Sequence, residues 1–222
     1  DNNMSGNNPK PLLVVKYRNQ NGLEEYMKYL PQPFNTGNTF VNTYNGNMVG
    51  EFTIGSTNGG KFPALVKLIY NTNDVVLNND IGYGVGMRLS LHQTIKSVTI
   101  DGIQYLEYVD EDGTIHYFLS NRVIYNENGQ LETENEDNTY YDEDGLDMKI
   151  IEQSSKYVLS DKNGNSMEFT KGTNIALLTK IIDTAGNYIT VEYNNGIIYR
   201  VVDSNNEAIN ISKSYNLIQV VS

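Results

Sequence analysis

Residues 161–169 read Asp-Lys-Asn-Gly-Asn-Ser-Met-Glu-Phe, and residues 183–193 read Asp-Thr-Ala-Gly-Asn-Tyr-Ile-Thr-Val-Glu-Tyr. Both stretches begin with an Asp-x-x-Gly tetrad and end, after a run of strand-forming residues, in an aromatic residue. Asp starts a turn by accepting hydrogen bonds from the backbone that follows it, and Gly adopts the left-handed conformation that many turns require. Each stretch therefore predicts a turn leading into a β-strand, whose final aromatic packs on a neighbouring hairpin.

The tetrad recurs through the second half of the chain at intervals of 16, 16, 19, 22 and 20 residues. A period near twenty residues is typical of stacked hairpins, in which each unit covers the apolar face of the next. The strand after the first tetrad, at 114–118, also ends in an aromatic. The tetrads are Asp110–Gly113, Asn126–Gly129, Asp142–Gly145, Asp161–Gly164 and Asp183–Gly186, with a degenerate copy, Asp203–Asn206, that has Asn in place of Gly.

Strands are also predicted upstream of the tetrads. Asn45-Gly46 lies between two strand-like runs, which is typical of a hairpin, and Asn58-Gly59-Gly60 marks a second turn before residues 64–70. Residues 87–95 alternate apolar and polar side chains, which predicts one strand lying half-buried on a core. Its apolar face is Met87, Leu89, Leu91 and Ile95, and its polar face is Arg88, Ser90, His92 and Thr94.

The N-terminal part gives weaker signals. Residues 12–18 predict a first strand, and helical spacing of apolar residues over 23–30 predicts a short helix that Pro31 stops, with a loop to Asn38. The predicted fold class is all-β, built of stacked antiparallel hairpins with at most one or two short helices. The predicted organisation is a flexible lead-in at 1–11, a pre-repeat β region at 12–109, and degenerate hairpin repeats at 110–222.

Composition excludes several function classes. The 222 residues carry a net charge of −11, which argues against nucleic-acid or anionic membrane binding through a basic patch. The absence of Cys excludes disulfides and a thiol nucleophile. The longest apolar runs, such as residues 12–15, are too short for a membrane-spanning helix. With 31 Asn, 17 Tyr and 19 Gly, the composition favours short turns and many strands. The start at Asp1 favours a segment excised from a longer protein.

The acidic clusters and the two histidines are candidates for metal-binding or catalytic residues. The acidic clusters sit on predicted turns, where carboxylates are solvated, so plain turns are favoured over a weak calcium site. The two histidines, His92 and His116, have no partner at metal-ligand spacing, and no carboxylate pair is singled out for glycoside hydrolysis. We therefore predict no catalytic, cofactor or metal residues. The acidic clusters are Asp110-Glu111-Asp112, then Glu132, Glu134, Glu136 and Asp137, then Asp142-Glu143-Asp144.

The glycine-rich stretch at 82–86 and the abundant tyrosines each allow a functional and a structural interpretation. Residues 82–86, Gly-Tyr-Gly-Val-Gly, lack the Lys and the helix of a phosphate loop, and predict a sharp entry into a strand. Abundant tyrosines favour cross-strand packing, with a sugar-stacking platform as the alternative. The candidates for that platform are Tyr105, Tyr108, Tyr117, Tyr125, Tyr140 and Tyr141.

Three stretches carry a resemblance to a known family. They are GLEEY at 22–26 with VNTYNGNMV at 41–49, LIYNT at 68–72 with GYGVGMRL at 82–89, and the tetrad ladder. Over residues 20–211 the chain resembles the start of an Rhs/YD-repeat protein, a family that includes bacterial cell-wall-associated proteins, polymorphic toxins, the C component of insecticidal toxin complexes, and teneurins. It departs from the family pattern at Met87, where Trp is usual, and in the irregular later repeats.

The resemblance implies an all-β, non-catalytic structural module that begins the shell of a large secreted or cell-surface protein. Its implied partner is the downstream YD repeats of the same polypeptide, because family activity sits in a variable C-terminal toxin domain. Asn- and Ile-rich usage fits a low-GC Gram-positive bacterium. The alternative is a carbohydrate-binding module that recognises cell-surface polysaccharide through a Tyr- and Asn-rich β face. An edge-to-edge homodimer through the C-terminal strands is also expected, because unpaired strands promote association.

Overall fold

The computed structural model describes residues 22–23, 27–34, 37–58, 60–125, 128, 130–143, 145–214 and 217–221. It is 57% strand and 3% helix, and all of its strand pairs are antiparallel, which confirms the all-β prediction. The predicted lead-in at 1–11 and strand at 12–18 lie outside the described residues.

The first sheet has five strands in chain order, β1-β2-β3-β4-β5. The hairpin predicted at Asn45-Gly46 is confirmed, since it connects β2 to β3. Asn58 and Gly60 of the second predicted turn lie in the connection from β3 to β4; Gly59 is outside the described residues. Gly46 and Gly60 have φ of 75° and 88°, in the left-handed region that suits glycine. The bounds are β1 (Tyr29–Phe34), β2 (Gly37–Asn42), β3 (Met48–Ser56), β4 (Leu65–Asn71) and β5 (Met87–Leu89).

The helix predicted over 23–30 is wrong at residues 27–30, and the loop predicted from Pro31 to Asn38 is wrong at 31–34 and 37–38, because β1 and β2 pair there. Residues 24–26 and 35–36 lie outside the described residues. Two prolines explain the difference: a residue that precedes proline disfavours the helical conformation, and both Leu30 and Gln32 precede one. The one helix among the described residues is α1 (Thr72–Val76), capped at its start by the side chain of Asn71.

Eight strands of the second sheet close into a barrel. The barrel closes because β15 pairs with β14 on one side and, through Ala176 and Leu177, with β6 on the other. Its strands are β6 (Thr94–Ile100), β7 (Ile103–Val109), β8 (Ile115–Leu119), β11 (Thr139–Asp142), β12 (Met148–Glu152), β13 (Lys156–Asp161), β14 (Ser166–Lys171) and β15 (Ala176–Ile182). Between β8 and β11 the chain forms a separate hairpin of β9 (Arg122–Tyr125) and β10 (Leu131–Glu134).

The remaining hairpins extend the sheet beyond the barrel. Further along β15, residues 180–182 pair with β16, and each later strand pairs with the one before it. The extension consists of β16 (Tyr188–Asn194), β17 (Ile197–Val202), β18 (Ala208–Ser214) and β19 (Leu217–Val221). The predicted segment boundary at 109/110 lies between β7 and β8, which are both strands of the barrel. The chain passes from the five-stranded sheet to the barrel earlier, at residues 89–94.

The single strand predicted over 87–95 is wrong. The segment divides into β5 in the five-stranded sheet and the start of β6 in the barrel, with a turn between them. Its polar face is not solvated either, because Arg88, Ser90, His92 and Thr94 are all buried. The alternation of apolar and polar residues predicts that successive side chains point in opposite directions, but here the side chains on both faces are buried.

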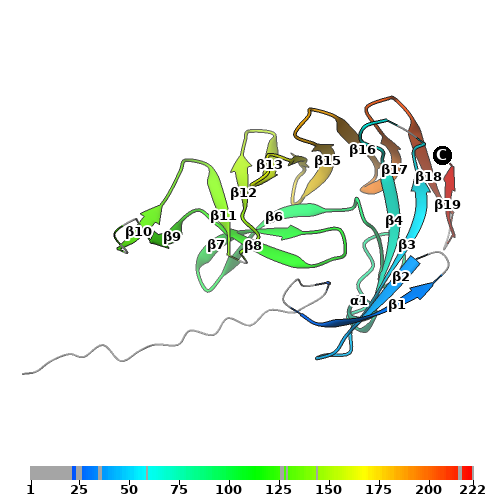
Figure 1. The fold of residues 1–222 in the computed structure, drawn as a ribbon, viewed down its shortest axis with the longest axis horizontal. Helices are drawn as coiled ribbons and strands as arrows, with labels where there is room; N and C mark the ends of the chain where they lie inside the picture. The colour runs from blue at the N-terminus through cyan, green and yellow to red at the C-terminus, as the bar shows by residue number, and fades with distance from the viewer. Residues whose placement is uncertain are drawn as a thin grey trace, which may run out of the picture.

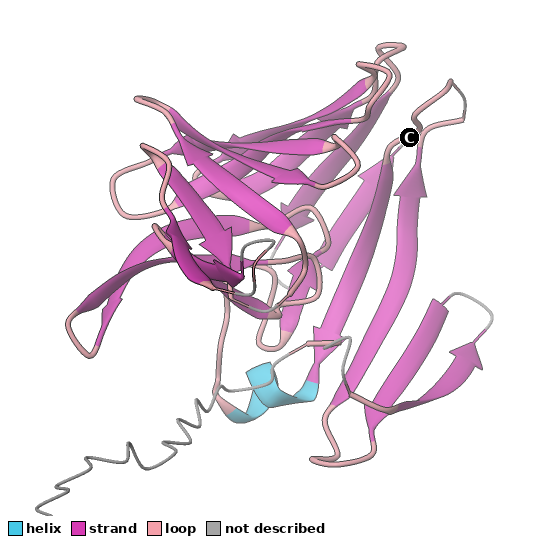
Figure 2. Cartoon of the chain, turned by 60° about the vertical axis from the view of Figure 1, so that its left-hand side comes forward, coloured by secondary structure: helices cyan, strands magenta, loops and turns pink. Residues whose placement is uncertain are grey.

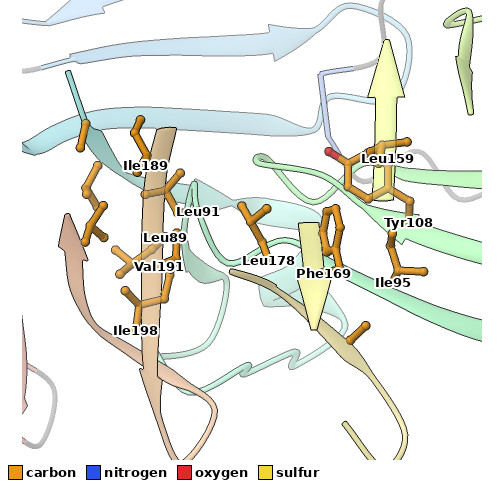
Figure 3. Packing of buried hydrophobic residues seen from close by; sticks show 14 of the residues in the cluster. Leu89, Leu91, Ile95, Tyr108, Leu159, Phe169, Leu178, Ile189, Val191 and Ile198 are labelled. Atoms are coloured by element: carbon orange, nitrogen blue, oxygen red, sulfur yellow. The ribbon is translucent and has the colours of Figure 1, made fainter. Parts of the chain in front are cut away.

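The five-stranded sheet packs face to face on the extension, as the views in Figures 1 and 2 show. The contact is close, since a Cβ added at Gly55 of β3 would lie 2.8 Å from Val220 of β19. A single cluster of buried apolar side chains joins this layer to the barrel interior, and Figure 3 shows Val191 and Ile198 in one part and Phe169 and Tyr108 in the other. No helix in the described part of the chain has the length and apolarity needed to span a membrane.

Candidate functional site

The last three tetrad turns share one hydrogen-bond pattern. In the turn that opens at Asp183, the carboxylate Oδ1 accepts the backbone N–H groups of Ala185 and Asn187, at 2.9 and 2.8 Å. Asp161 and Asp203 accept the equivalent pairs of N–H groups, at 2.8 to 3.0 Å. At Asp161 and Asp183 the side-chain amide of Asn165 or Asn187 is the largest cause of a lowered pKa, and the backbone N–H groups add to it. At Asp203 burial raises the pKa, but hydrogen bonds from Thr57 and from the backbone N–H groups lower it overall. The predicted Asp-led turns are confirmed at Asp110–Gly113, Asp161–Gly164, Asp183–Gly186 and Asp203–Asn206; most of Asn126–Gly129, and Asp144 of the Asp142–Gly145 tetrad, lie outside the described residues.

The fourth residue of each described tetrad has positive φ. Gly113, Gly145, Gly164 and Gly186 lie between 79° and 97°, and Asn206, in the degenerate copy, has φ of 65°. Asn tolerates this region better than other side-chain-bearing residues, so the last copy keeps the turn without its glycine. The aromatics that close the following strands are also where the sequence predicts, because Phe118 and Phe169 are fully buried.

The last turn has a second role in the structure. Asp203 is buried, and the N–H of Asn58, in the β3–β4 loop, donates to the Glu207 carboxylate at 2.8 Å. A Cβ at Gly60 would meet the amide of Asn205, so this loop and the turn are in direct contact. The degenerate tetrad therefore connects the repeat ladder to the five-stranded sheet.

The acidic cluster 110–112 is engaged within the protein. Asp110 Oδ1 accepts three backbone N–H groups of its own turn, and Asp112 accepts the N–H of Leu23 at 3.0 Å. Among the described residues, no group of three or more His, Asp or Glu side chains is placed to hold a metal ion. The histidine at 116 also serves this turn, since its Nε2 lies 3.2 Å from Asp110 Oδ2 and its ring stacks on Tyr108.

Arg88 connects this turn to the five-stranded sheet. Its guanidinium is buried, donates to the Asp110 carbonyl at 3.0 Å, and lies against Gly113. Desolvation lowers the pKa of Arg88, while Asp74, Asp110 and Asp112 oppose that shift. Burial raises the pKa of Asp110, while its hydrogen bond to His116 lowers it. The Arg88 guanidinium thus joins β5 of the five-stranded sheet to the Asp110 turn of the barrel.

The glycine-rich stretch 82–86 forms a tight loop before β5, as predicted. All three glycines have φ between 73° and 111°, and Asp80 Oδ1 accepts the N–H groups of Gly82 and Gly84 at 2.7 and 3.0 Å. The loop turns Tyr83 inward, where its hydroxyl accepts the N–H of Ile198 at 2.9 Å and lies 3.1 Å from His92 Nδ1. These glycines shape the backbone so that one tyrosine reaches the core.

The six tyrosines considered for a sugar platform do not form one in the described structure. Tyr105, Tyr108 and Tyr141 are buried, and Tyr117 and Tyr140 are half-buried; nothing is described for the side chain of Tyr125. Tyr117 contacts Tyr105 edge to face, and Tyr140 donates to Glu152 at 3.1 Å. Packing, the favoured interpretation, accounts for the positions of these rings.

A different pair of tyrosines is exposed on the outer face of β16 and β17, which the sequence analysis missed. Tyr188 and Tyr199 are 39% and 43% exposed. Tyr199 is the extra residue of a bulge, because Glu192 pairs with Arg200 and Tyr193 pairs with Ile198. Its hydroxyl donates to Glu192 at 2.6 Å, and Lys180 lies 4.2 Å from the centre of the Tyr188 ring. A bulge leaves little signal in sequence, since it breaks the alternation by which a face is recognised.

Comparisons with known proteins give little. No protein-family model matches the chain, and no curated protein matches it. One similar solved structure is a chain of the Photorhabdus luminescens Tc holotoxin pore, at 11% identity and a TM-score of 0.41. The match covers 87% of this chain and 10% of that chain, so this chain spans about a tenth of its length. At this level the likeness carries no argument about function.

Proposed function

We propose that this chain is a non-catalytic structural module at the start of the β-shell of a large secreted or cell-surface YD-repeat protein. Its partner is the next hairpin repeat of the same polypeptide. The sequence resemblance and the ladder of Asp-led hairpins support this proposal. The observation that carries it is the position of β19, the final strand of the twelve-stranded sheet, which pairs with β18 and with no other strand in the described structure.

An edge such as β19 favours the addition of another strand. Its backbone groups on the side away from β18 are available for a new ladder, and Ile218 and Val220 already pack against the core. The residues that might guard this edge are engaged elsewhere: Lys213 donates to the Gly82 carbonyl, and Glu207 accepts the N–H of Asn58. A following hairpin would therefore continue both the sheet and the core.

The test compares this chain with a version extended by the next one or two repeats of the full-length protein. The added interface is worth on the order of a few kcal/mol, so the extended version is expected to melt several degrees higher. Hydrogen exchange at β19 should slow at the same time. An unchanged melting temperature with unchanged exchange at β19 would contradict the module. An extension of scrambled sequence and equal length is the matched control.

The non-catalytic part of the proposal has its own test. In the described chain, the Asp110–Asp112 cluster and both histidines are buried or paired within the protein, and no interaction joins a nucleophile to a base in an open site. No turnover is expected on a panel of glycan, peptide and ester substrates. Turnover that a single substitution at His92, or at any carboxylate, abolishes would overturn this part.

Binding of cell-surface polysaccharide is the second candidate, and one observation favours it. The outer face of β16 and β17 presents the exposed rings of Tyr188 and Tyr199, with Glu192 and Arg200 next to Tyr199, a combination of ring faces and polar groups that suits sugars. Affinity electrophoresis in soluble polysaccharides and sedimentation with peptidoglycan would detect binding. Tyr188→Ala with Tyr199→Ala should weaken it. Tyr44→Ala is the control, because Tyr44 is 85% exposed in the β2–β3 turn, away from this face.

A further inference from the structure

His92 occupies the one place where the glycine-rich loop, the link between the two sheets and the β16–β17 hairpin all meet. Its ring lies between two tyrosine rings, Tyr83 at 5.3 Å and Tyr193 at 5.9 Å, both edge to face. The Tyr193 hydroxyl donates to the Leu91 carbonyl at 3.2 Å, next to His92 in sequence. The imidazole is therefore held on both sides within the core, only 7% exposed.

The hydrogen bonds around Tyr83 fix which partner carries each proton. The backbone N–H of Ile198 can only donate, so the Tyr83 oxygen accepts from it. We assign the hydroxyl hydrogen of Tyr83 to the contact with His92 Nδ1, 3.1 Å away, because no other acceptor lies within hydrogen-bond reach of it in the described structure. Nδ1 must accept, which makes His92 neutral with its hydrogen on Nε2. Burial, the largest cause, raises the pKa of Tyr83 to about 12, so the phenol keeps this hydrogen at neutral pH.

A second proton on His92 is incompatible with this arrangement. Nδ1 would become a donor, and the hydroxyl hydrogen of Tyr83 would lose its acceptor inside the core. The groups that face the ring are Tyr83 from the loop, Tyr193 from β16 and the Arg88 cation from β5; Asp74, Asp110 and Asp112 act on Arg88. An imidazolium would therefore be buried close to a cation, without a carboxylate of its own.

We propose that His92 is an acid-sensitive latch, whose protonation releases the 80–86 loop from the last hairpins of the ladder. The loop holds two of their strands: Tyr83 binds the backbone of β17, and the Gly82 carbonyl accepts from Lys213 of β18. Release would loosen the end of the sheet at which the next repeat is proposed to dock. The effect on repeat docking rests on the proposed function. The acid-sensitive latch at His92 does not.

The direction of the pH effect follows from the shift at His92. Burial, with a smaller contribution from Arg88, lowers the pKa of His92 from 6.5 to about 4 in the folded chain. A lowered histidine pKa means that the unfolded or opened state takes up the proton first. The latch is therefore fully closed above about pH 6.5 and weakens as the pH falls toward 4.

The test measures hydrogen exchange of residues 80–86 and 197–202 at pH 7.5 and pH 4.5, corrected for the intrinsic pH dependence of exchange. Opening of the loop in the natural chain should increase on the order of tenfold to a hundredfold at the lower pH. His92→Asn keeps an acceptor near Nδ1 but cannot be protonated, so it should lose this increase. Carboxylates such as Asp110 titrate in both proteins, so their effects cancel in the comparison.

Two matched tyrosine variants complete the experiment. Tyr83→Phe removes the latch hydroxyl and should open the loop at both pH values. Tyr193→Phe removes the neighbouring hydroxyl and should keep the acid response. An acid response in His92→Asn as large as that of the natural chain would overturn the latch. So would a nitrogen NMR spectrum of the natural chain that places the hydrogen of neutral His92 on Nδ1, a measurement that requires no variant to fold.

Discussion

At the scale of single residues, the repeat ladder depends on backbone conformations that only a few residue types tolerate. The tetrad could be predicted from sequence because Asp and Gly each carry a local preference that needs no tertiary contact. What could not be predicted was the burial of Arg88, His92 and Asp203, since burial is decided by elements far away in the chain. Alternation of polar with apolar residues predicts a solvated polar face, whereas here the polar residues are buried where the two sheets meet.

The glycine position of the tetrad gives the first prediction. Gly186 has φ of 81°, and a Cβ there would meet no atom within 4 Å, so Gly186→Ala changes backbone strain alone. We expect it to lower the free energy of unfolding by about 1–2 kcal/mol. Gly186→Asn should recover much of that loss, as Asn206 does in the degenerate copy. Chemical denaturation measures both, and equal stability of the two variants would contradict the explanation.

The aromatic that closes a repeat gives the second prediction. Phe169 is fully buried in the barrel, and its ring lies 5.8 Å from that of Tyr108. Phe169→Ala should lower the free energy of unfolding by about 3–5 kcal/mol, because it removes apolar contacts and leaves a cavity. Phe169→Leu keeps much of the volume and should lose clearly less. A denaturation midpoint that does not change in Phe169→Ala would show that the repeat does not depend on its aromatic.

At the scale of elements, the hairpins were predictable and their partners were not. Asn45-Gly46 and the tetrads each specify a turn, so neighbouring strands follow directly. Closure of the barrel depends on β15, which leaves β6 after two residues and pairs with β16 further along. A partner change of that kind has no local signature, because the same strand residues suit either neighbour. The helix expected over 23–30 failed for a related reason, since pairing with β2 and two prolines outweigh apolar spacing.

The prolines of β1 give the third prediction, which concerns the edge of the five-stranded sheet. The Gln32 carbonyl points to β2, where it accepts from the Thr39 hydroxyl, so the backbone at Pro31 and Pro33 faces the open edge. Proline has no N–H there, which blocks pairing with another strand. Pro31→Val with Pro33→Val should therefore promote self-association in light scattering. The control, Pro31→Lys with Pro33→Lys, restores the N–H groups but adds charge, and should stay unassociated by this edge.

At the scale of the whole molecule, the edge strands β1 and β19 differ in the backbone N–H groups that they can offer to another strand. The β1 edge lacks N–H groups at two positions, while the β19 edge keeps an N–H at every residue. The two layers are connected by the Arg88 cluster, the Tyr83–His92 pair and the Asp203 turn, three polar contacts set around one continuous apolar core. The β1 edge of the five-stranded sheet thus resists the addition of a strand, whereas the β19 edge of the twelve-stranded sheet favours it, in agreement with the proposed docking of a following repeat at β19.

The last prediction follows from that asymmetry. Without a following repeat, the β19 edge should pair with the same edge of a second molecule, so the chain is expected to dimerise at high concentration. Gln219 and Val221 are exposed on β19, and Gln219→Lys with Val221→Lys would place like charges along the paired strands. This variant should stay monomeric in analytical ultracentrifugation. The control, Thr190→Lys with Glu192→Lys, puts the same two lysines on β16, an interior strand, and should leave the dimer intact. Two lysines on β19 must disturb an interface formed by the β19 edge. If both variants dimerise as the natural chain does, the dimer contact therefore does not involve β19.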